Sequence, residues 1–275
     1  MYLSSLNLEN FIEKLFDSAS LDTRSANIVT KRFGLSSPET DTLQALGNQY
    51  DITRERVRQL EEQAIAKIKK IVADFEEALI LQDFVEKHLS ATGGLRRNDI
   101  LMREIHSLAK STNNADVFSN QAGFIFQALE RPFFCKEDNT FYSFWYTSDE
   151  ARKKMEIIHN EIISNFEKVE QFDEILRSVT ALRDMQETIV VSLLAISKHL
   201  GVGPYGDFGL TKWDEINPKT VRAKAFTFLK KEGAPQHFTE IAKKIGSHAP
   251  TVHNELIKDP RFVLVGRGTY GLRLK

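Results

Sequence analysis

Two short amphipathic stretches separated by three residues constrain the fold of this chain more than any other feature. In the first stretch, apolar and small residues recur at the spacing of one helix face: Leu43, Leu46, Gly47 and Tyr50. Asp51, Ile52 and Thr53 interrupt that pattern, and Thr53 is a good N-cap for a second helix. The second helix gathers its apolar residues on one side: Val57, Leu60, Ala64 and Ile68. The pattern predicts a helix-turn-helix.

The opposite side of the second predicted helix is polar. Glu55, Arg58, Gln59 and Glu62 spread over about 100° of that side, and Arg54 projects from the exposed first turn. A second helix that offers such residues from its N-terminal turns is the layout of a DNA-reading helix-turn-helix. Arg56 points away from this set, and we expect it to meet a phosphate or an acidic neighbour.

These residue types suit base recognition. Arg pairs with O6 and N7 of guanine, Glu accepts from N4 of cytosine, and Gln bridges N6 and N7 of adenine. The alternative is an ordinary surface helix stabilised by pairs four residues apart. Because Arg54 and Arg58 form a like-charge pair at that spacing, which stabilises nothing, the pattern favours DNA reading.

The segment "IVTKRFGLSSPETDTLQALGNQYDITRERVRQLEEQAIAKIKK", residues 28–70, resembles region 4 of vegetative-type bacterial sigma factors, the promoter-recognition region. The resemblance rests on "RFGL", "TL…LG" and "TRERVRQLE". It implies that Arg54, Glu55, Arg58 and Gln59 read a promoter element. Gln63 and Ala66 stand where the family often has basic residues, which predicts weaker phosphate binding. Only 27 residues precede the match, too few for the upstream regions of a sigma factor. We therefore expect that this protein does not act as a sigma factor by itself.

The near-zero total charge hides a basic C-terminal end. The total is −1, yet residues 217–275 carry twelve Lys and Arg against four Asp and Glu, a net charge of +8. Such an end is typical of a module that binds a polyanion, although a lysine-rich solvated surface has the same composition.

The same end has the pattern of a winged helix. Asn217 is the expected cap of a helix with Pro218 at its first position, and Gly233 ends it. "HFTEIAKKIG" and "APTVHNELIKD" predict two further helices, and "RFVLVGRGTYGLRL" predicts a hairpin. In that hairpin the apolar residues alternate on either side of a turn at 266–268: Phe262 and Leu264 before it, Tyr270, Leu272 and Leu274 after it.

Residues 217–275 resemble the HARE-type winged helix found at the N-terminus of the RNA polymerase delta subunit, on "HFTEIAKKI", "TVHNELIKD" and "FVLVGRGTYGL". The resemblance implies binding to nucleic acid or polymerase. The candidate contacts, mostly to phosphate, are Lys243, Lys244, Thr251, Asn254 and Arg267. For Arg267, a solvated turn residue is the alternative.

The middle of the chain is acidic, with net charges of −3 over 76–148 and −5 over 149–216. "FIFQALERPFFCKEDNTFYSFWYTS" predicts a helix and an aromatic hairpin, so we interpret 76–148 as a possible degenerate winged helix whose aromatic residues form core. We interpret 149–214 as a helical spacer and connector, with a glycine-aromatic connector at 203–213. The remaining modules are then 1–75 and 215–275.

Several function classes find no support in the sequence. The longest apolar run, at 188–196, is far short of the roughly 20 residues of a membrane span, and the N-terminus lacks the basic region of a signal peptide. A single cysteine, Cys135, excludes an intramolecular disulfide. The histidines lack the spacing of helical metal ligands, and no catalytic triad or carboxylate pair stands out. We therefore expect that the protein is not an enzyme and that it binds no cofactor, metal or small-molecule substrate.

We therefore predict a mainly α protein with helix-turn-helix and winged-helix modules and short β-hairpin wings. The expected function is bacterial transcription factor or sigma-like regulator, cytoplasmic and nucleoid-associated, with double-stranded DNA and RNA polymerase core as partners. The alternative is a polymerase-associated adaptor, similar to the delta subunit, that does not read DNA sequence.

Overall fold

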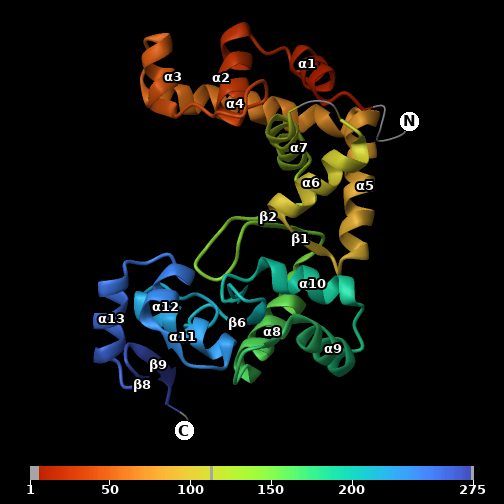
Figure 1. Cartoon of the computed structure of the whole chain (residues 1–275). Coiled ribbons are helices and arrows are strands. Elements are labelled where there is room, and N and C mark those ends of the chain that lie inside the picture. The colour runs from red at the N-terminus through yellow and green to blue at the C-terminus, as the bar shows by residue number, and fades with distance from the viewer. Residues whose placement is uncertain (1–5, 112–113, 274–275) are drawn as a thin grey trace. The chain divides into compact units, whose positions relative to one another are not determined.

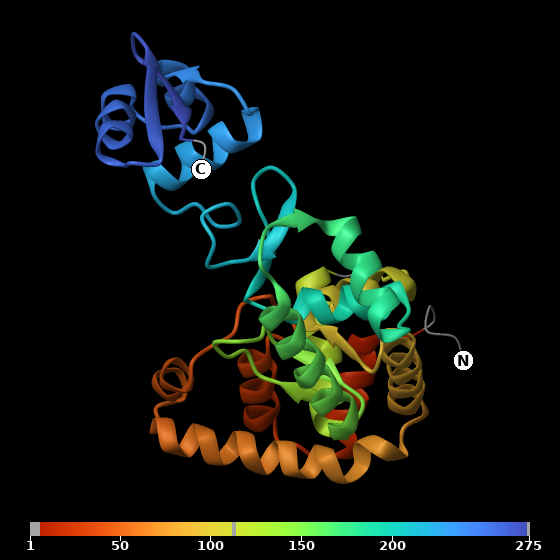
Figure 2. The ribbon, with the colours of Figure 1, turned by 90° about the horizontal axis from the view of Figure 1, so that it is seen from below.

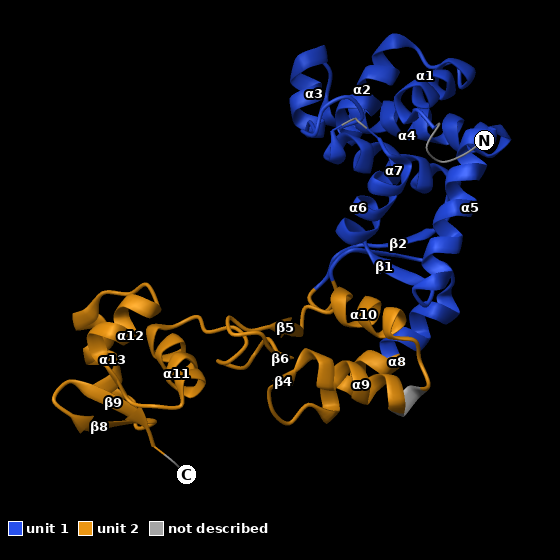
Figure 3. Cartoon of the chain, turned by 45° about the vertical axis from the view of Figure 1, so that its right-hand side comes forward, with its two compact units in different colours: residues 1–138, 142–156 blue, residues 139–141, 157–275 orange. Residues whose placement is uncertain are grey.

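Helices dominate the computed structural model, which describes residues 6–111 and 114–273. The sheets among the described residues are small, antiparallel and three-stranded. This confirms the predicted mainly α class with short hairpins. The chain divides into two compact units, unit 1 (1–138 and 142–156) and unit 2 (139–141 and 157–275), which are coloured separately in Figure 3.

Unit 1 contains the helix-turn-helix and the segment that follows it (Figure 1). Its elements are α1 (Leu8–Ser18), α2 (Thr23–Phe33), α3 (Leu43–Tyr50), α4 (Arg54–Ile71), the 3-10 helix η2 (Val72–Asp74), α5 (Glu76–Ala91), β1 (Leu95–Arg97), α6 (Asn98–Ala109), α7 (Ala115–Leu129), β2 (Phe133–Cys135) and β3 (Phe144–Tyr146). Helix α8 (Asp149–Asn165) begins in unit 1 and continues into unit 2.

Unit 2 holds the remaining elements. They are β4 (Glu170–Gln171), α9 (Phe172–Arg183), α10 (Glu187–Ile196), β5 (Leu200–Val202), β6 (Asp207–Leu210), α11 (Val221–Glu232), β7 (Gln236–His237), α12 (Phe238–Lys244), α13 (Ala249–Lys258), β8 (Phe262–Gly266) and β9 (Thr269–Leu272).

One order of elements occurs three times along the described chain: helix, strand, helix, helix, strand, strand. We name these segments repeat 1 (α5 to β3), repeat 2 (α8 to β6) and repeat 3 (α11 to β9). The sheet orders are β1-β3-β2, β4-β6-β5 and β7-β9-β8, so the last strand of each repeat lies in the centre of its sheet. All these pairings are antiparallel. The three segments therefore share one topology.

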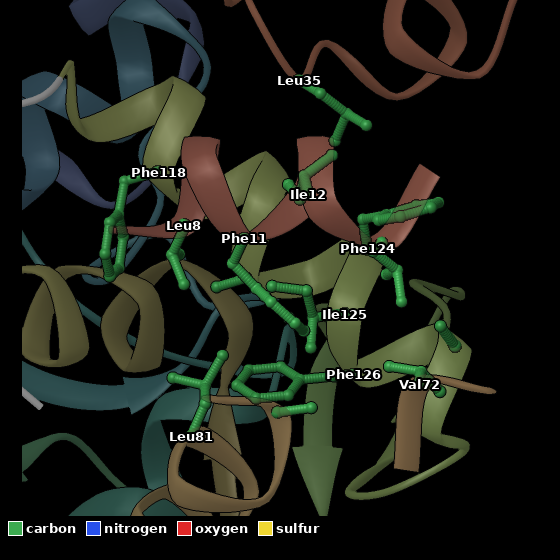
Figure 4. Close-up of a cluster of buried hydrophobic side chains, with 14 of the residues drawn as sticks. Leu8, Phe11, Ile12, Leu35, Val72, Leu81, Phe118, Phe124, Ile125 and Phe126 are labelled. Carbon is green, nitrogen blue, oxygen red and sulfur yellow. The ribbon is translucent and has the colours of Figure 1, made fainter. Parts of the chain in front are cut away.

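Helix α7 lies at the centre of the core of unit 1. Its buried aromatic residues meet rings from both sides of the sequence: Phe124 packs edge-on against Phe33 of α2 at 5.0 Å, and Phe126 against Trp145 of β3 at 5.3 Å between ring centroids. Figure 4 shows Phe11 of α1 and Ile125 of α7 in the same cluster. Repeat 1 and the segment before it thus share one hydrophobic core, and the boundary expected between 75 and 76 falls inside a compact unit.

Two amides of α7 also hold the loop that follows α2. Asn120 Nδ2 donates to the carbonyl of Gly34 at 3.2 Å, and Gln121 Nε2 donates to that of Leu35 at 2.7 Å. Gly34 adopts a left-handed φ of +62°, and a Cβ there would lie 2.5 Å from Asn120. The loop therefore requires glycine, and α7 fixes its position.

Repeat 3 has its own core. Phe228 and Leu229 of α11, Ile241 of α12, Leu256 of α13 and Tyr270 of β9 are buried together. Gly266 ends β8, and Arg267 and Gly268 form the turn to β9, within the predicted 266–268. Gly268 has a φ of +69°. A Cβ at Gly268 would lie 2.5 Å from His237 Nε2, which explains why glycine stands there.

Three expectations for these parts differ from the structure or lie outside it. Residues 149–214, expected as a helical spacer and connector, contain β4, β5 and β6, with β5 and β6 inside or beside the expected connector. Helix α11 begins at Val221 and is capped by Thr220, not Asn217, because the Thr220 hydroxyl accepts from the Ala223 amide at 3.1 Å. The backbone amide of Asn217 instead donates to the Trp213 carbonyl in the preceding turn. Leu274 lies outside the described residues.

In the described part of the chain, no helix is both long enough and apolar enough to cross a membrane.

Candidate nucleic-acid interface

Helices α3 and α4 and the turn between them form as the sequence predicted. Thr42 and Thr53 cap the two helices, their hydroxyls accepting at 3.1 Å from the amides of Ala45 and Arg56. Asp51 ends α3 with a left-handed φ of +53°. A Cβ on Gly47 would lie 2.8 Å from the Ile52 carbonyl, so the small residue lets the turn close tightly against α3.

The buried side of α4 anchors it in unit 1. Val57 packs with Ile28 of α2 and Leu46 of α3, and all three are fully buried. Ala64 and Ile68 enter the larger core around α7, and Leu60 is half-buried, as the periodicity predicted. Figure 2 shows α4 as one long helix, in orange.

Ion pairs from neighbouring elements further fix α4. Arg32 Nε lies 3.1 Å from Glu61 Oε2, and its Nη1 donates to the Asp41 carbonyl at 2.6 Å. Lys69 Nζ lies 2.6 Å from Glu130 Oε1, the residue that caps α7. The two ion pairs join the middle and the C-terminal end of α4 to the rest of unit 1. The sequence-based reasoning did not include them because the partners are distant in sequence.

The opposite side of α4 is open to solvent. Arg54, Glu55, Arg58 and Gln59 are all exposed and lie in its first two turns. Arg58 donates to Glu55 through two nitrogens, Nε at 3.0 Å and Nη2 at 2.6 Å, and through Nη1 to Glu62. Glu55, Arg58 and Glu62 therefore form one cluster in which a guanidinium lies between two carboxylates.

Arg58 and Glu55 hold each other in the charged state. Hydrogen bonds from Arg58, above all, lower the pKa of Glu55. The same hydrogen bonds and the charges of Glu55 and Glu62 raise the pKa of Arg58. The Arg58 guanidinium and the Glu55 carboxylate are thus ionised near neutral pH.

Arg56, expected to point away from the reading set, contacts one of its members: its Nη1 donates to Gln59 Oε1 at 3.2 Å. The expected phosphate contact of Arg56 stays a prediction. Gln59 lies three residues away on the same helix, a spacing at which side chains meet. The carbonyl oxygen of Gln59 is therefore engaged when no DNA is bound.

The C-terminal candidates all lie on the surface of repeat 3. Lys243 and Lys244 end α12, Thr251 and Asn254 lie on α13, and Arg267 lies in the β8-β9 turn; all five are exposed. The apolar side of α13, Val252 and Leu256, is buried in the core. The structure thus places these residues in one folded segment, on three separate elements.

Part of the positive charge of repeat 3 is neutralised internally. Arg261 pairs with the buried Asp259 at 2.8 Å and with Asp214 at 3.1 Å. Its guanidinium lowers the pKa of Asp259 by hydrogen bonding and also lies over the Phe226 ring at 4.6 Å. Arg222 pairs with Glu255 at 2.6 Å. Both arginines are therefore held by acidic partners, although the net charge of +8 for residues 217–275 already subtracts Asp259 and Glu255.

No group of His, Cys, Asp and Glu suited to hold a metal ion occurs among residues 6–111 and 114–273. Cys135 is a half-buried free thiol, and desolvation raises its pKa.

Residues 19–70 match the family Sigma-70, region 4. The chain is similar to the RNA polymerase principal sigma factor HrdD of Streptomyces coelicolor, with 40% identity over 60 residues, 21% of this chain and 18% of that protein. It is also similar to the RNA polymerase sigma factor SigA of Lactococcus lactis subsp. cremoris, 35% identical over 68 residues (25% and 18%). A third relative is the RNA polymerase sigma factor RpoS of Coxiella burnetii, 37% identical over 70 residues (26% and 19%).

The chain thus spans less than a fifth of the length of these relatives. The matched segment covers α2, α3 and nearly all of α4, which are the elements that position the exposed face of α4. The predicted resemblance to sigma region 4 is confirmed for this segment.

Proposed function

We propose that this protein is a DNA-binding transcription regulator that reads promoter-type DNA through α4 and acts with RNA polymerase. One observation carries the proposal: the first two turns of α4 present Arg54, Glu55, Arg58 and Gln59 to solvent within a segment that matches Sigma-70, region 4. Proteins similar over this segment are RNA polymerase sigma factors, which supports polymerase as the partner.

The geometry supports an order of roles within the reading set. Arg54 lies in the first turn with its side chain exposed, which suits bidentate pairing with guanine. Glu55 accepts two hydrogen bonds from Arg58, so its carboxylate accepts from the amine of cytosine when it turns away from that guanidinium. Arg58 and Gln59 reach bases only after exchanging their present partners, Glu55 and Arg56.

We further propose that repeat 3 is a HARE-type winged helix that adds sequence-independent affinity. Lys243, Lys244 and Arg267 contact phosphates, and Thr251 and Asn254 contact the duplex from α13. The exposure of these five side chains and the excess of Lys and Arg in 217–275 support this role. Repeats 1 and 2, which are acidic, serve as scaffold and protein-docking segments.

The proposal is tested with the full chain and a preferred duplex selected from a randomised pool. Replacing Arg58 or Gln59 by Ala should weaken binding to the preferred duplex by about 1 to 3 kcal/mol and relax specificity at one or two base pairs. Thr251→Ala serves as a control, because it removes a proposed contact without touching α4. Equal losses on preferred and scrambled duplexes would contradict base reading and favour the adaptor function.

A further inference from the structure

Glu62 continues the candidate reading face of α4. At 100° per residue, Glu62 lies between Arg58 and Gln59 in direction, and it follows Glu55 by two turns, about 10 Å along the helix axis. Its side chain is 59% exposed, as much as that of Glu55. A carboxylate therefore lies in the middle of a surface that is proposed to approach a polyanion.

The partner of Glu62 is a member of the reading set. Arg58 contributes Nη1 to Glu62, and Nε and Nη2 to Glu55. The guanidinium is thus shared between two carboxylates, and the three groups together carry a charge of −1. A phosphate that is to bind Arg58 must compete with both carboxylates and approach Glu62 closely.

The neighbouring positions do not compensate for this charge. Gln63 and Ala66, which follow on the exposed side of α4, are uncharged. Further along the helix, Lys67 donates to the Ser20 carbonyl at 3.3 Å and Lys69 pairs with Glu130. Lys67 keeps its charge in that hydrogen bond, and exposed Lys70 adds a second charge, so the positive charge on this half of α4 lies beyond positions 63 and 66 and not beside Glu62.

We propose that Glu62 is a specificity-determining residue that suppresses binding to DNA of the wrong sequence, an inference that rests on the proposed function. On such DNA, Arg58 stays with its carboxylates and Glu62 repels the backbone. On the preferred sequence, Glu55 turns to a base amine, which releases two hydrogen bonds of Arg58 for the duplex. Specificity is a difference between two affinities, and a repulsive group can set it as well as an attractive one.

The test compares full-length wild type, Glu62→Gln and the matched control Glu13→Gln on preferred and scrambled duplexes over a range of salt concentrations. Glu13 is an exposed helical glutamate of α1 whose replacement changes the net charge equally. Glu62→Gln should tighten binding to the scrambled duplex by about threefold to tenfold and to the preferred duplex by less than about twofold. The dependence of log affinity on log salt should steepen by about one phosphate contact. Glu13→Gln should change neither the affinity for the two duplexes nor the salt dependence.

Three outcomes would overturn the inference. The first is that Glu62→Gln binds both duplexes as wild type does, and the second is that it binds both more tightly by the same factor. The third is that it loses affinity for the preferred duplex alone, which would make Glu62 a base-reading residue. Failure of the proposed function is separate, because wild type itself would then bind preferred and scrambled duplexes equally.

Discussion

Helices α7 and α13 occupy the same place in repeats 1 and 3 but have opposite surroundings. Helix α7 is buried on nearly all sides, and the buried residues include polar Gln121 and small Gly123 as well as aromatic rings. In α13 the buried residues are Val252 and Leu256, and the rest of the helix faces solvent or its surface partners. The same topology thus serves once as the centre of a core and once as an open face.

Repeat 2 clarifies what the difference teaches. Its third helix, α10, contains neither Lys nor Arg, and its first turn carries Glu187. Repeat 3 differs from repeat 2: α13 exposes Thr251 and Asn254, and the adjoining α12 ends in exposed Lys243 and Lys244. The shared topology alone therefore does not predict a nucleic-acid surface, and the proposed role of repeat 3 rests on these exposed side chains.

The largest effect is expected where α7 enters the core. Phe126→Ala should destabilise unit 1 by about 3 to 5 kcal/mol, because it leaves a cavity against Trp145. Asn254→Ala on α13 should change stability by less than about 0.5 kcal/mol. The loss of stability in Phe126→Ala is measured by denaturant unfolding, followed by the fluorescence of Trp145 in a Trp213→Phe background. Small effects of similar size from Phe126→Ala and Asn254→Ala would contradict the contrast between α7 and α13.

A buried carboxylate makes the stability of repeat 3 depend on pH. Hydrogen bonds from Arg261 lower the pKa of Asp259 in the folded state, so its stabilising effect is present above the unfolded pKa and is lost as pH falls through the folded value. Asp259→Asn should cost about 1.5 to 3 kcal/mol at neutral pH. The difference from wild type should shrink as pH falls from about 4 through the lowered folded pKa of Asp259, below which the carboxyl is uncharged like the amide of Asn. A pH-independent difference would contradict this account.

The open face of repeat 3 should contribute affinity without selectivity. Reversing the charges of Lys243, Lys244 and Arg267 should weaken binding of the full chain to a preferred duplex at least about tenfold, roughly 1.4 kcal/mol, because a tethered second contact is lost. Reversal of Lys87, an exposed lysine of repeat 1 paired with Asp83, is the control. If the triple variant binds as tightly as wild type at matched salt, repeat 3 more plausibly engages polymerase.

The smallest expected effect concerns the cap of α4. Thr53→Ala removes one hydrogen bond to the Arg56 amide and should destabilise the helix-turn-helix by about 1 kcal/mol. Thr53→Ser keeps the hydroxyl and should restore most of that loss. Thermal unfolding of the two variants checks the claim, which fails if Ser and Ala are equivalent.

The sequence predicted the local features well. Periodicity, the Thr53 cap and the glycine turn at 266–268 depend on residues close together in the chain, and the structure has them where they were expected. Arg58 pairs with Glu55 and Glu62 at spacings of three and four residues, which local sequence also allows, whereas the like-charge spacing of Arg54 and Arg58 alone predicts no stabilising pair. Strands β5 and β6 were missed because they are short and contain glycine.

The shared core of unit 1 could not be predicted from pattern alone. The apolar character of α7 indicates burial on several sides, but the segment "FIFQAL" does not indicate that α1, α2 and α4 are the helices that pack against it. Likewise, Asn217-Pro218 is a good helix start by residue type, and Thr220 replaces it because residues 213–217 close a turn of their own. Long-range packing decided the first case, and a local turn decided the second.

The most direct test is the sequence preference of the full chain, measured by selection from randomised duplexes for wild type, Gln59→Ala and the Lys243, Lys244 and Arg267 charge reversal. The account predicts that Gln59→Ala loses preference at one or two base pairs, whereas the charge reversal lowers affinity and leaves the preference profile unchanged. A profile altered by the charge reversal, or one that Gln59→Ala leaves intact, would contradict the claim that α4 reads the sequence and repeat 3 supplies affinity alone.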